Sequence, residues 1–149
     1  MSKQEKILIV DDDVALSESL VTILENEGYF IDTARTGREA EAKMKAGYYN
    51  VALLDIRLPD MTGIELLSRV NVIAPRTKKL VLTGYPDAPS AIRAVNEKAD
   101  AYLVKPFDPD ELIALIEEHL KMQRDELEYT QEKVLEYIQN RVKELDTLN

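Results

Sequence analysis

Five charged side chains stand out as able to do chemistry: the acidic run Asp11, Asp12 and Asp13, the isolated Asp55, and Lys105. The run, Asp55 and Lys105 each directly follow a short apolar segment, at residues 7–10, 51–54 and 101–104. Apolar segments of this length, bounded by polar residues, are typical of buried parallel strands. The carboxyl ends of such strands line one edge of a sheet, where ligands bind. Several carboxylates facing one lysine at that edge indicate a divalent cation and a phosphoryl group.

Strand and helix patterns alternate five times along the chain, which predicts a doubly wound α/β fold with a five-stranded parallel sheet. Strands are expected at residues 6–11, 29–33, 50–55, 79–83 and 101–104. Helices are expected after each strand, at residues 14–27, 37–46, 64–70, 90–98 and from 109 onward. Asp13 and Asp108 are predicted N-caps, and Gly28 and Gly47 mark helix ends. The alternation does not reveal the order of the strands.

The bulk composition excludes several classes of function. The 149 residues fit one domain of ordinary size with a sizeable core. A net charge of −9 argues against binding to nucleic acid or to an anionic membrane. The chain has no cysteine, so disulfides and thiolate metal sites are impossible. Only six residues precede the first apolar segment, which is too short for a signal peptide or a membrane span. A cytoplasmic location is expected.

The chain changes character after Leu120, so we expect one domain at residues 1–121 and a helical extension or linker at residues 122–149. Residues 121–149 contain neither glycine nor proline. Their apolar side chains recur with the spacing of one helix face: Leu127, Val134, Ile138, Val142, Leu145 and Leu148. The stripe could pack on its own domain. The interpretation we favour is a stalk, a possible coiled coil, that dimerises or leads to another module, although Arg124, Gln131 and Arg141 interrupt its heptads.

Four motifs, in order at the ends of the first, third, fourth and fifth predicted strands, together resemble the receiver domain of two-component response regulators. They are Ile-Leu-Ile-Val-Asp11-Asp12, Leu-Leu-Asp55-Ile-Arg-Leu-Pro59-Asp-Met-Thr-Gly63, Leu-Thr83-Gly84 and Tyr102-Leu-Val-Lys105-Pro106-Phe107. Each motif alone is weak, but the ordered set is specific. The resemblance covers residues 5–121 and implies a flavodoxin-like receiver fold.

The resemblance implies that Asp55 is the phosphorylation site. A strand-end carboxylate can attack phosphorus and form an acyl phosphate. The implied donor is a phosphohistidine on a sensor histidine kinase or a histidine phosphotransfer protein. Lys105 and the hydroxyl of Thr83 would contact the phosphoryl group, and Gly84 would leave room for the donor. A cis peptide bond between Lys105 and Pro106 is implied as the device that aims the lysine, since X-Pro bonds adopt cis at low cost.

The resemblance also implies a magnesium site, which Mn²⁺ could fill as well. Crowded carboxylates are costly to ionise unless a cation lies among them, and Mg²⁺ prefers oxygen ligands in octahedral geometry. By the family pattern, Asp12 and Asp55 ligate directly, Asp11 acts through water, and the backbone carbonyl of Arg57 supplies another oxygen. Asp13 is expected to cap the first helix instead.

A switch is the third implication of the resemblance. Thr83 would move toward the phosphoryl group and the ring of Tyr102 would turn inward, giving two alternative packings. The face made by residues 90–98, the strand at 101–104 and the helix from 109 would then engage an output domain or a target protein. A homodimer is possible through that face or through the C-terminal helix. Contacts with nucleic acid or with a membrane are not expected.

Two other functions compete with that of a receiver. A Mg²⁺-dependent phosphatase of the haloacid-dehalogenase type also uses a strand-end aspartate, but it needs a general-acid carboxylate two residues later, where this chain has Arg57. A receiver-like interaction domain that has lost phosphorylation would lack part of the site, whereas Asp55, Lys105 and the acidic pair are all present.

Two large side chains near the expected mouth of the site, Arg57 and Tyr85, could shield an acyl phosphate from water, so we expect slow autodephosphorylation. His119 lies among glutamates on the last predicted helix and is expected at the surface, with no role in phosphotransfer.

Overall fold

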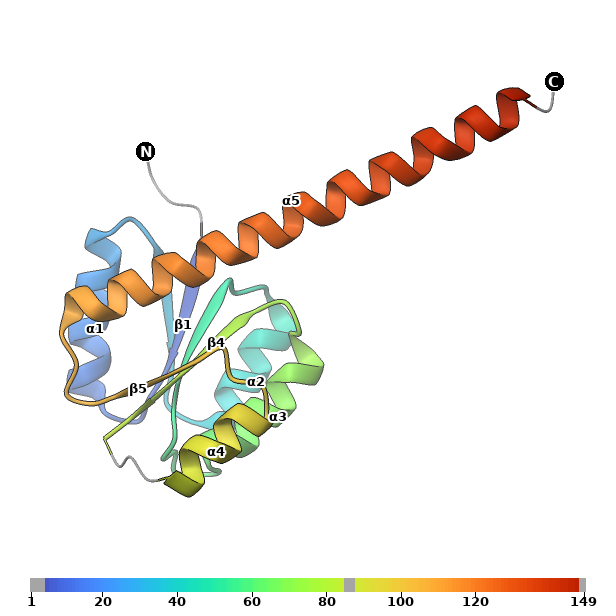
Figure 1. The fold of residues 1–149 in the computed structure, drawn as a ribbon. Coiled ribbons are helices and arrows are strands. Elements are labelled where there is room, and N and C mark those ends of the chain that lie inside the picture. Colours follow the sequence, from blue (N-terminus) through green and yellow to red (C-terminus); the bar gives the residue numbers. More distant parts are fainter. Residues whose placement is uncertain (1–4, 85–87, 148–149) are drawn as a thin grey trace.

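The computed structural model describes residues 5–84 and 88–147, which form one doubly wound α/β body with a projecting helix (Figure 1). All five strands are parallel, in the order β2-β1-β3-β4-β5. The strands are β1 (Lys6–Val10), β2 (Phe30–Ala34), β3 (Val51–Asp55), β4 (Lys78–Thr83) and β5 (Ala101–Val104). The helices are α1 (Val14–Asn26), α2 (Gly37–Ala46), α3 (Gly63–Ile73), α4 (Ala88–Asn96) and α5 (Pro109–Thr147). The predicted fold class is confirmed, and the strand order places β1 beside β3.

The central strands are apolar throughout because both faces of the sheet are covered. Ile7 and Ile9 of β1 face the core shared with α1 and α5, while Leu8 and Val10 face the core shared with α2, α3 and α4. This alternation is the period-two geometry of a strand. Burial on both sides explains why β1 and β3 appear in the sequence as continuous apolar segments rather than alternating ones.

Local signals fixed the helix ends within about three residues of their predicted positions. Asp13 caps α1, since its carboxylate accepts from the backbone N–H of Leu16 at 3.1 Å. Gly28 follows α1 with φ of 93°, a conformation that favours glycine. Asp108 caps α5 by accepting from the N–H of Asp110 at 2.9 Å. The largest shift is at the end of α3, which runs to Ile73 rather than to residue 70.

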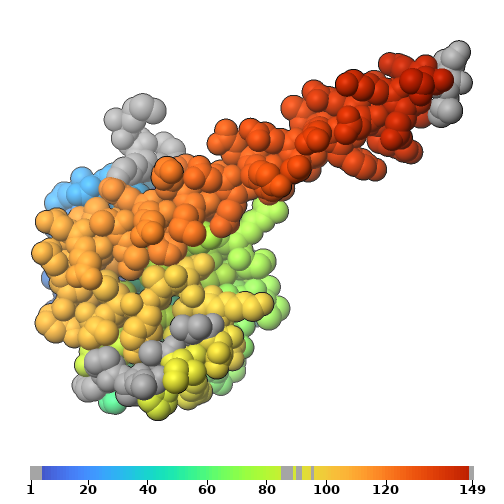
Figure 2. Space-filling view, viewed as in Figure 1, coloured from blue at the N-terminus to red at the C-terminus, as the bar shows by residue number. Residues whose placement is uncertain are grey.

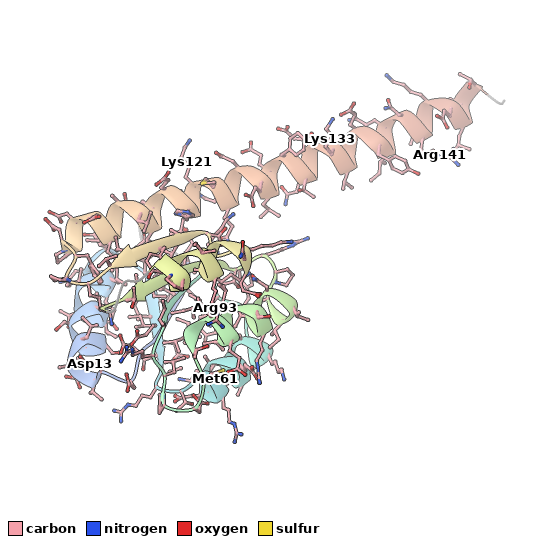
Figure 3. The ribbon with its side chains drawn as sticks, turned by 60° about the horizontal axis from the view of Figure 1, so that its bottom comes forward. Asp13, Met61, Arg93, Lys121, Lys133 and Arg141 are labelled. Atoms are coloured by element: carbon pink, nitrogen blue, oxygen red, sulfur yellow. The ribbon has the colours of Figure 1, made fainter. Side chains whose placement is uncertain are left out.

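The last helix, α5, is one uninterrupted element of 39 residues. Its first turns are buried through Leu112, Ile116 and Leu120, whereas its distal part stands clear of the body (Figure 2). Figure 3 labels Lys133 and Arg141 on this projecting part. The apolar stripe is about half exposed, from 50% at Leu127 to 55% at Leu145. The stripe therefore does not pack on its own domain. Leu148 lies outside the described residues.

Polar contacts hold α5 at the point where it leaves the body. The side-chain amide of Gln123 donates to the carbonyls of Asn50 (3.0 Å) and Arg76 (2.8 Å). The Asn50 amide donates in return to Gln123 Oε1 at 3.1 Å. Next to these contacts, Arg124 pairs with Glu5 at 2.9 Å. Gln123 thus joins α5 to the loops at the edge of the sheet opposite Asp55.

The prediction that His119 lies at the surface is wrong. Its side chain is buried, and its Nδ1 lies 2.8 Å from the carbonyl oxygen of Leu115, to which the ring donates. The reason is helix periodicity, because His119 falls three residues after Ile116 on the face that covers the sheet. Its glutamate neighbours point elsewhere on the helix.

Candidate functional site

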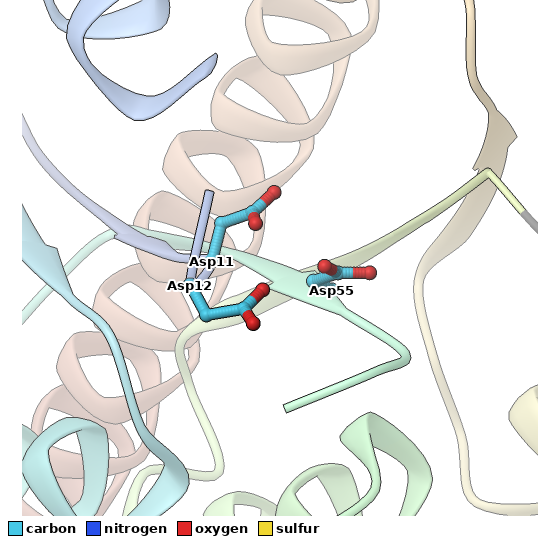
Figure 4. Close-up of side chains that lie close together, drawn as sticks. All are labelled: Asp11, Asp12 and Asp55. Atoms are coloured by element: carbon cyan, nitrogen blue, oxygen red, sulfur yellow. The ribbon is translucent and has the colours of Figure 1, made fainter. Parts of the chain in front are cut away.

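The acidic residues meet at the carboxyl edge of the sheet because β1 and β3 are adjacent. Val10 pairs with Leu54, so Asp11 and Asp55, the next residues on the two strands, lie side by side. One carboxylate oxygen each of Asp11, Asp12 and Asp55 lies within 4.8 Å of the others (Figure 4). Asp11 is buried, Asp12 is exposed and Asp55 is between the two. This edge is the point where the strand order reverses, the usual ligand site of doubly wound sheets.

Lys105 reaches into this cluster from the end of β5. Its Nζ lies 2.9 Å from Oδ2 of Asp11 and 3.7 Å from Oδ2 of Asp55. Its backbone N–H donates to the carbonyl of Thr83 at 2.7 Å, which anchors it to β4. The peptide bond between Lys105 and Pro106 is cis, in agreement with the expected geometry. The structure therefore assembles the acidic group and the lysine as the sequence predicts.

Negative charge outweighs positive charge in the cluster. Burial, followed by the negative charge of Asp11, raises the pKa of Asp55 to about 6. The ammonium of Lys105 acts in the opposite direction but does not offset these effects. Three closely spaced carboxylates with one lysine form an oxygen-donor set that suits a hard divalent cation. The residues present thus fit Mg²⁺ or Mn²⁺ as the implied metal.

The remaining predicted residues lie around this cluster. Thr83 ends β4 and is completely buried. Gly84 follows it, and a Cβ there would lie 3.9 Å from the side chain of Lys105, an ordinary contact. Tyr102 on β5 is partly buried and packs against the core on the α2–α4 side of the sheet. Gly84 thus leaves open the space beside the lysine.

The segment after Asp55 is a tight loop. The backbone N–H of Arg57 donates to Oδ1 of Asp55 at 3.3 Å. The loop closes where the N–H of Gly63 donates to the carbonyl of Ile56 at 2.6 Å. A Cβ on Gly63 would lie 2.1 Å from the carbonyl oxygen of Asp55, so a larger residue cannot occupy that position without a shift of the backbone. Arg57 is exposed, and Tyr85 lies outside the described residues.

Comparison with known families identifies this arrangement. The family model of the response regulator receiver domain matches residues 7–117. The chain belongs to the response regulator receiver family. The transcriptional regulatory protein BasR of Escherichia coli is 40% identical to this receiver over 111 residues, which are 74% of this chain and 50% of BasR. The alginate biosynthesis regulator AlgB of Pseudomonas aeruginosa is 36% identical over 110 residues, which are 74% of this chain and 24% of AlgB. This receiver thus spans half or less of these relatives.

Solved receiver structures resemble this one closely. A CheY-like receiver domain protein from Methanospirillum hungatei superposes with a TM-score of 0.81 at 43% identity, over 83% of this chain and 99% of that one. The beryllofluoride-activated NtrC4 receiver domain, solved as a dimer, gives 0.75 at 34% identity over 79% and 98% of the two chains. The flavodoxin-like receiver fold is therefore shown. Among the described residues of this receiver, no helix is both long enough and apolar enough to cross a membrane.

A second cluster of acid and lysine in this receiver was not predicted from the sequence. On edge strand β2, the carboxylate of Asp32 accepts from Lys43 Nζ at 2.9 Å, from the Tyr49 hydroxyl at 2.6 Å and from the N–H of Thr33 at 2.8 Å. Burial alone would raise the pKa of Asp32, but these hydrogen bonds outweigh it and lower the pKa. The alternation of polar and apolar residues on β2 was the available signal for a half-exposed strand.

Proposed function

We propose that Asp55 accepts a phosphoryl group from the phosphohistidine of a sensor kinase or of a histidine phosphotransfer protein. One carboxylate oxygen of Asp55 forms a bond to phosphorus while the bond from phosphorus to the histidine nitrogen breaks, and the imidazole keeps that electron pair. The product is an acyl phosphate on this chain. Phosphorylation and its later hydrolysis are then reactions of the protein on itself, and the chain turns over no separate substrate.

Asp11, Asp12 and Asp55 are the side chains that would hold the metal, with Asp11 acting through water and the carbonyl of Arg57 as a further ligand. The observation that supports this is the grouping of three carboxylates within 4.8 Å around a half-buried aspartate. When bound, Mg²⁺ or Mn²⁺ supplies positive charge to the phosphoryl oxygens. Asp11 also orients Lys105 through their 2.9 Å contact.

Lys105 and Thr83 act on the phosphoryl group from the β4–β5 side. The lysine ammonium, 3.7 Å from Asp55, would contact a phosphoryl oxygen as a point charge. The hydroxyl of Thr83 would donate a hydrogen bond to another phosphoryl oxygen. Gly84 leaves the donor histidine room to approach, since Lys105 is the one side chain of the described residues that would lie within 4 Å of a Cβ there.

Phosphorylation would change the surface of the domain through movements of Thr83 and Tyr102. As Thr83 shifts toward the phosphoryl group, the ring of Tyr102 turns further into the core that it already borders. The face formed by α4, β5 and α5 changes as a result and engages a target protein or an output domain. That face carries exposed apolar side chains at Ile92 and Val104, which a partner could bury.

The single observation behind this proposal is the convergence of Lys105 with three carboxylates at the switch point of the sheet. Its test is uptake of phosphoryl from acetyl phosphate with Mg²⁺, followed by mass spectrometry of the intact chain. We expect the wild type to gain one phosphoryl group and Asp55→Asn to gain none, with Asp32→Asn as a matched control that behaves as wild type. No uptake by the wild type would favour a phosphorylation-independent interaction domain. Steady turnover of a phosphomonoester would favour a phosphatase.

We further propose that the stalk, which is the part of α5 from residue 122 to residue 147, pairs with the stalk of a second copy or continues toward an output domain. Its described stripe is exposed from Leu127 to Leu145, which is unusual for a monomer. Light scattering should show a dimer that becomes a monomer when residues 122–149 are removed. A monomer at every concentration would contradict pairing of the stalks. The domain boundary at residue 121 and the cytoplasmic location stay predictions.

A further inference from the structure

The carboxylate of Asp60, in the loop of residues 56–62, contacts the first turn of α2. One of its oxygens accepts from the backbone N–H of Gly37 at 2.8 Å, and the other accepts from the N–H of Arg38 at 3.0 Å. These are N–H groups of the first turn of α2, which have no partner within the helix. A carboxylate at this end of a helix is also favoured by the helix dipole. Asp60 therefore fixes the loop of residues 56–62 to the start of α2.

We propose that Asp60 is a positioning residue of the phosphorylation site, which acts by holding the loop of residues 56–62 and the start of α2 at a fixed separation. This inference rests on the proposed function, because the groups that it positions are Asp55, Asp11 and the carbonyl of Arg57. We call the contact of Asp60 with Gly37 and Arg38 the α2 brace.

On one side, the α2 brace acts on Asp55. Asp60 lies three residues after Arg57, whose N–H donates to Oδ1 of Asp55 at 3.3 Å. The loop is short and closed at its base, by the bond from Gly63 to the carbonyl of Ile56 and by the bridge between Arg57 and Thr62. A shift of Asp60 is therefore passed to Arg57 and to the orientation of the Asp55 carboxylate.

On the other side, the α2 brace acts on Asp11. The backbone N–H of Asp11 donates to the carbonyl of Ala34, the last residue of β2, at 3.0 Å. Only two residues separate Ala34 from Gly37, where α2 begins. The start of α2 is therefore connected through Ala34 to the backbone of Asp11. Asp60 connects it to the loop of residues 56–62, which contacts Asp55.

Close packing accompanies these hydrogen bonds. A Cβ on Gly37 would lie 2.4 Å from Sδ of Met61, the residue after Asp60. The loop thus packs directly against the start of α2, and Figure 3 labels Met61 at this end of the body. Metal ligands that are held by well-fixed neighbours bind more tightly, and loss of such a neighbour typically costs about 10- to 100-fold in affinity.

The competing explanation is that Asp60 does no more than cap α2, and Thr36 provides the matched control. The hydroxyl of Thr36 accepts from the N–H of Glu39 at 3.0 Å, so it caps the same helix end. In contrast to Asp60, Thr36 belongs to α2's own N-terminal turn and not to the loop of residues 56–62. Thr36→Ala weakens the helix end, whereas Asp60→Ala weakens it and also releases the loop.

The experiment measures Mg²⁺ affinity by calorimetry and amide hydrogen exchange in the metal-free protein. The full chain is used as wild type, Asp60→Ala, Asp60→Asn and Thr36→Ala. We expect Asp60→Ala to lower the Mg²⁺ affinity about tenfold and to speed exchange at Arg57 and Gly63. Asp60→Asn keeps one acceptor oxygen and should lie between Asp60→Ala and wild type. Thr36→Ala should lose comparable thermal stability and keep the wild-type affinity and loop exchange.

Equal loss of Mg²⁺ affinity in Asp60→Ala and Thr36→Ala would overturn the inference, and so would unchanged affinity in Asp60→Ala. Asp12→Asn separates this failure from failure of the proposed function. If the wild type binds Mg²⁺ and Asp12→Asn does not, the metal site stands whatever the Asp60 variants do. If the wild type binds no Mg²⁺, the proposed function fails, while the hydrogen exchange of the loop still tests the α2 brace.

Discussion

This receiver contains two clusters in which a lysine ammonium lies 2.9 Å from an aspartate, and they differ in how their charges are balanced. On β2, one carboxylate, that of Asp32, accepts from three donors and its pKa is lowered. At the carboxyl edge of the sheet, three carboxylates share Lys105, and the pKa of Asp55 is raised to about 6. The cluster on β2, the second one described above, is electrostatically complete and structural. The first cluster, at the carboxyl edge, lacks positive charge, and this deficit favours a divalent cation, which in the proposed function would offset the charge of the phosphoryl group.

The largest expected difference between the clusters concerns phosphoryl uptake. Lys105→Ala should slow uptake from acetyl phosphate about 100-fold or more, because a preorganised charge beside the phosphoryl group is lost. Lys43→Ala removes the lysine of the other cluster and should leave uptake unchanged. Time courses by mass spectrometry measure both rates. Comparable slowing in the two variants would mean that the lysines are not functionally distinct.

Neutralising the aspartate should change the free energy of unfolding in opposite directions in the two clusters. Because the folded-state pKa of Asp55 is raised, its ionisation destabilises the metal-free protein as the pH rises from about 4 through 6. Asp55→Asn should therefore gain about 3 kcal/mol of unfolding free energy at pH 7, and this gain should vanish near pH 4.

Asp32 has a lowered pKa, so its contribution to stability is present above the unfolded-state pKa near 4 and is lost as the pH falls further. Asp32→Asn should cost about 0.5 kcal/mol at pH 7, since the pair is partly exposed. Urea denaturation with a chelator, at pH 7 and pH 4, measures both variants. The same sign for both would contradict the contrast between the clusters.

The pH dependence of Mg²⁺ affinity should depend on the first cluster alone. Since Mg²⁺ binds the ionised carboxylate and the pKa of Asp55 is about 6, binding releases a proton at low pH. The Mg²⁺ affinity should fall about tenfold for each pH unit below 6. Calorimetric titrations at pH 7, 6 and 5 measure it, and Asp32→Asn should give the same slope as wild type. An affinity independent of pH would show that Asp55 is not a ligand.

The smallest expected effect is on the rate at which water hydrolyses the acyl phosphate in the first cluster. Arg57→Ala and Tyr85→Ala should each shorten the half-life of the acyl phosphate severalfold, because the sequence predicts that large side chains at these two positions shield it from hydrolysis. Arg69→Ala, an exposed arginine on α3, is the control. The decay of phosphorylated protein after removal of the donor measures the effect, and unchanged half-lives would refute shielding.

The residues of the first cluster could be predicted because each follows a short apolar strand, and parallel strands align their carboxyl ends. Asp13, Asp108 and Gly28 were predictable for a similar reason, since helix ends depend on neighbouring residues. The order of the strands was not predictable, because it depends on packing between distant segments. The prediction that His119 lies at the surface was wrong because it was based on the charged neighbours of His119 and not on its helical spacing from Ile116.

The contacts of Asp32 and Asp60 also could not be predicted from the sequence. Asp32 meets Lys43 and Tyr49 across 11 and 17 residues, and Asp60 meets Gly37 across 23. None of these pairs has a spacing that marks it as a neighbour, because the contacts arise where α2 packs beside β2 and where the loop of residues 56–62 packs against the start of α2. Pairs of this kind become visible only in three dimensions.

The polar contacts around Gln123 have a mechanical consequence, because α5 is both part of the core and a projecting rod. At the rise of an α-helix, the part beyond Leu120 is roughly 40 Å long. A tilt of about 5° where Gln123 meets Asn50 would swing the far end by roughly 3.5 Å. Rearrangements of less than an ångström at the base of α5 would thus be magnified into displacements as large as a side chain at its tip.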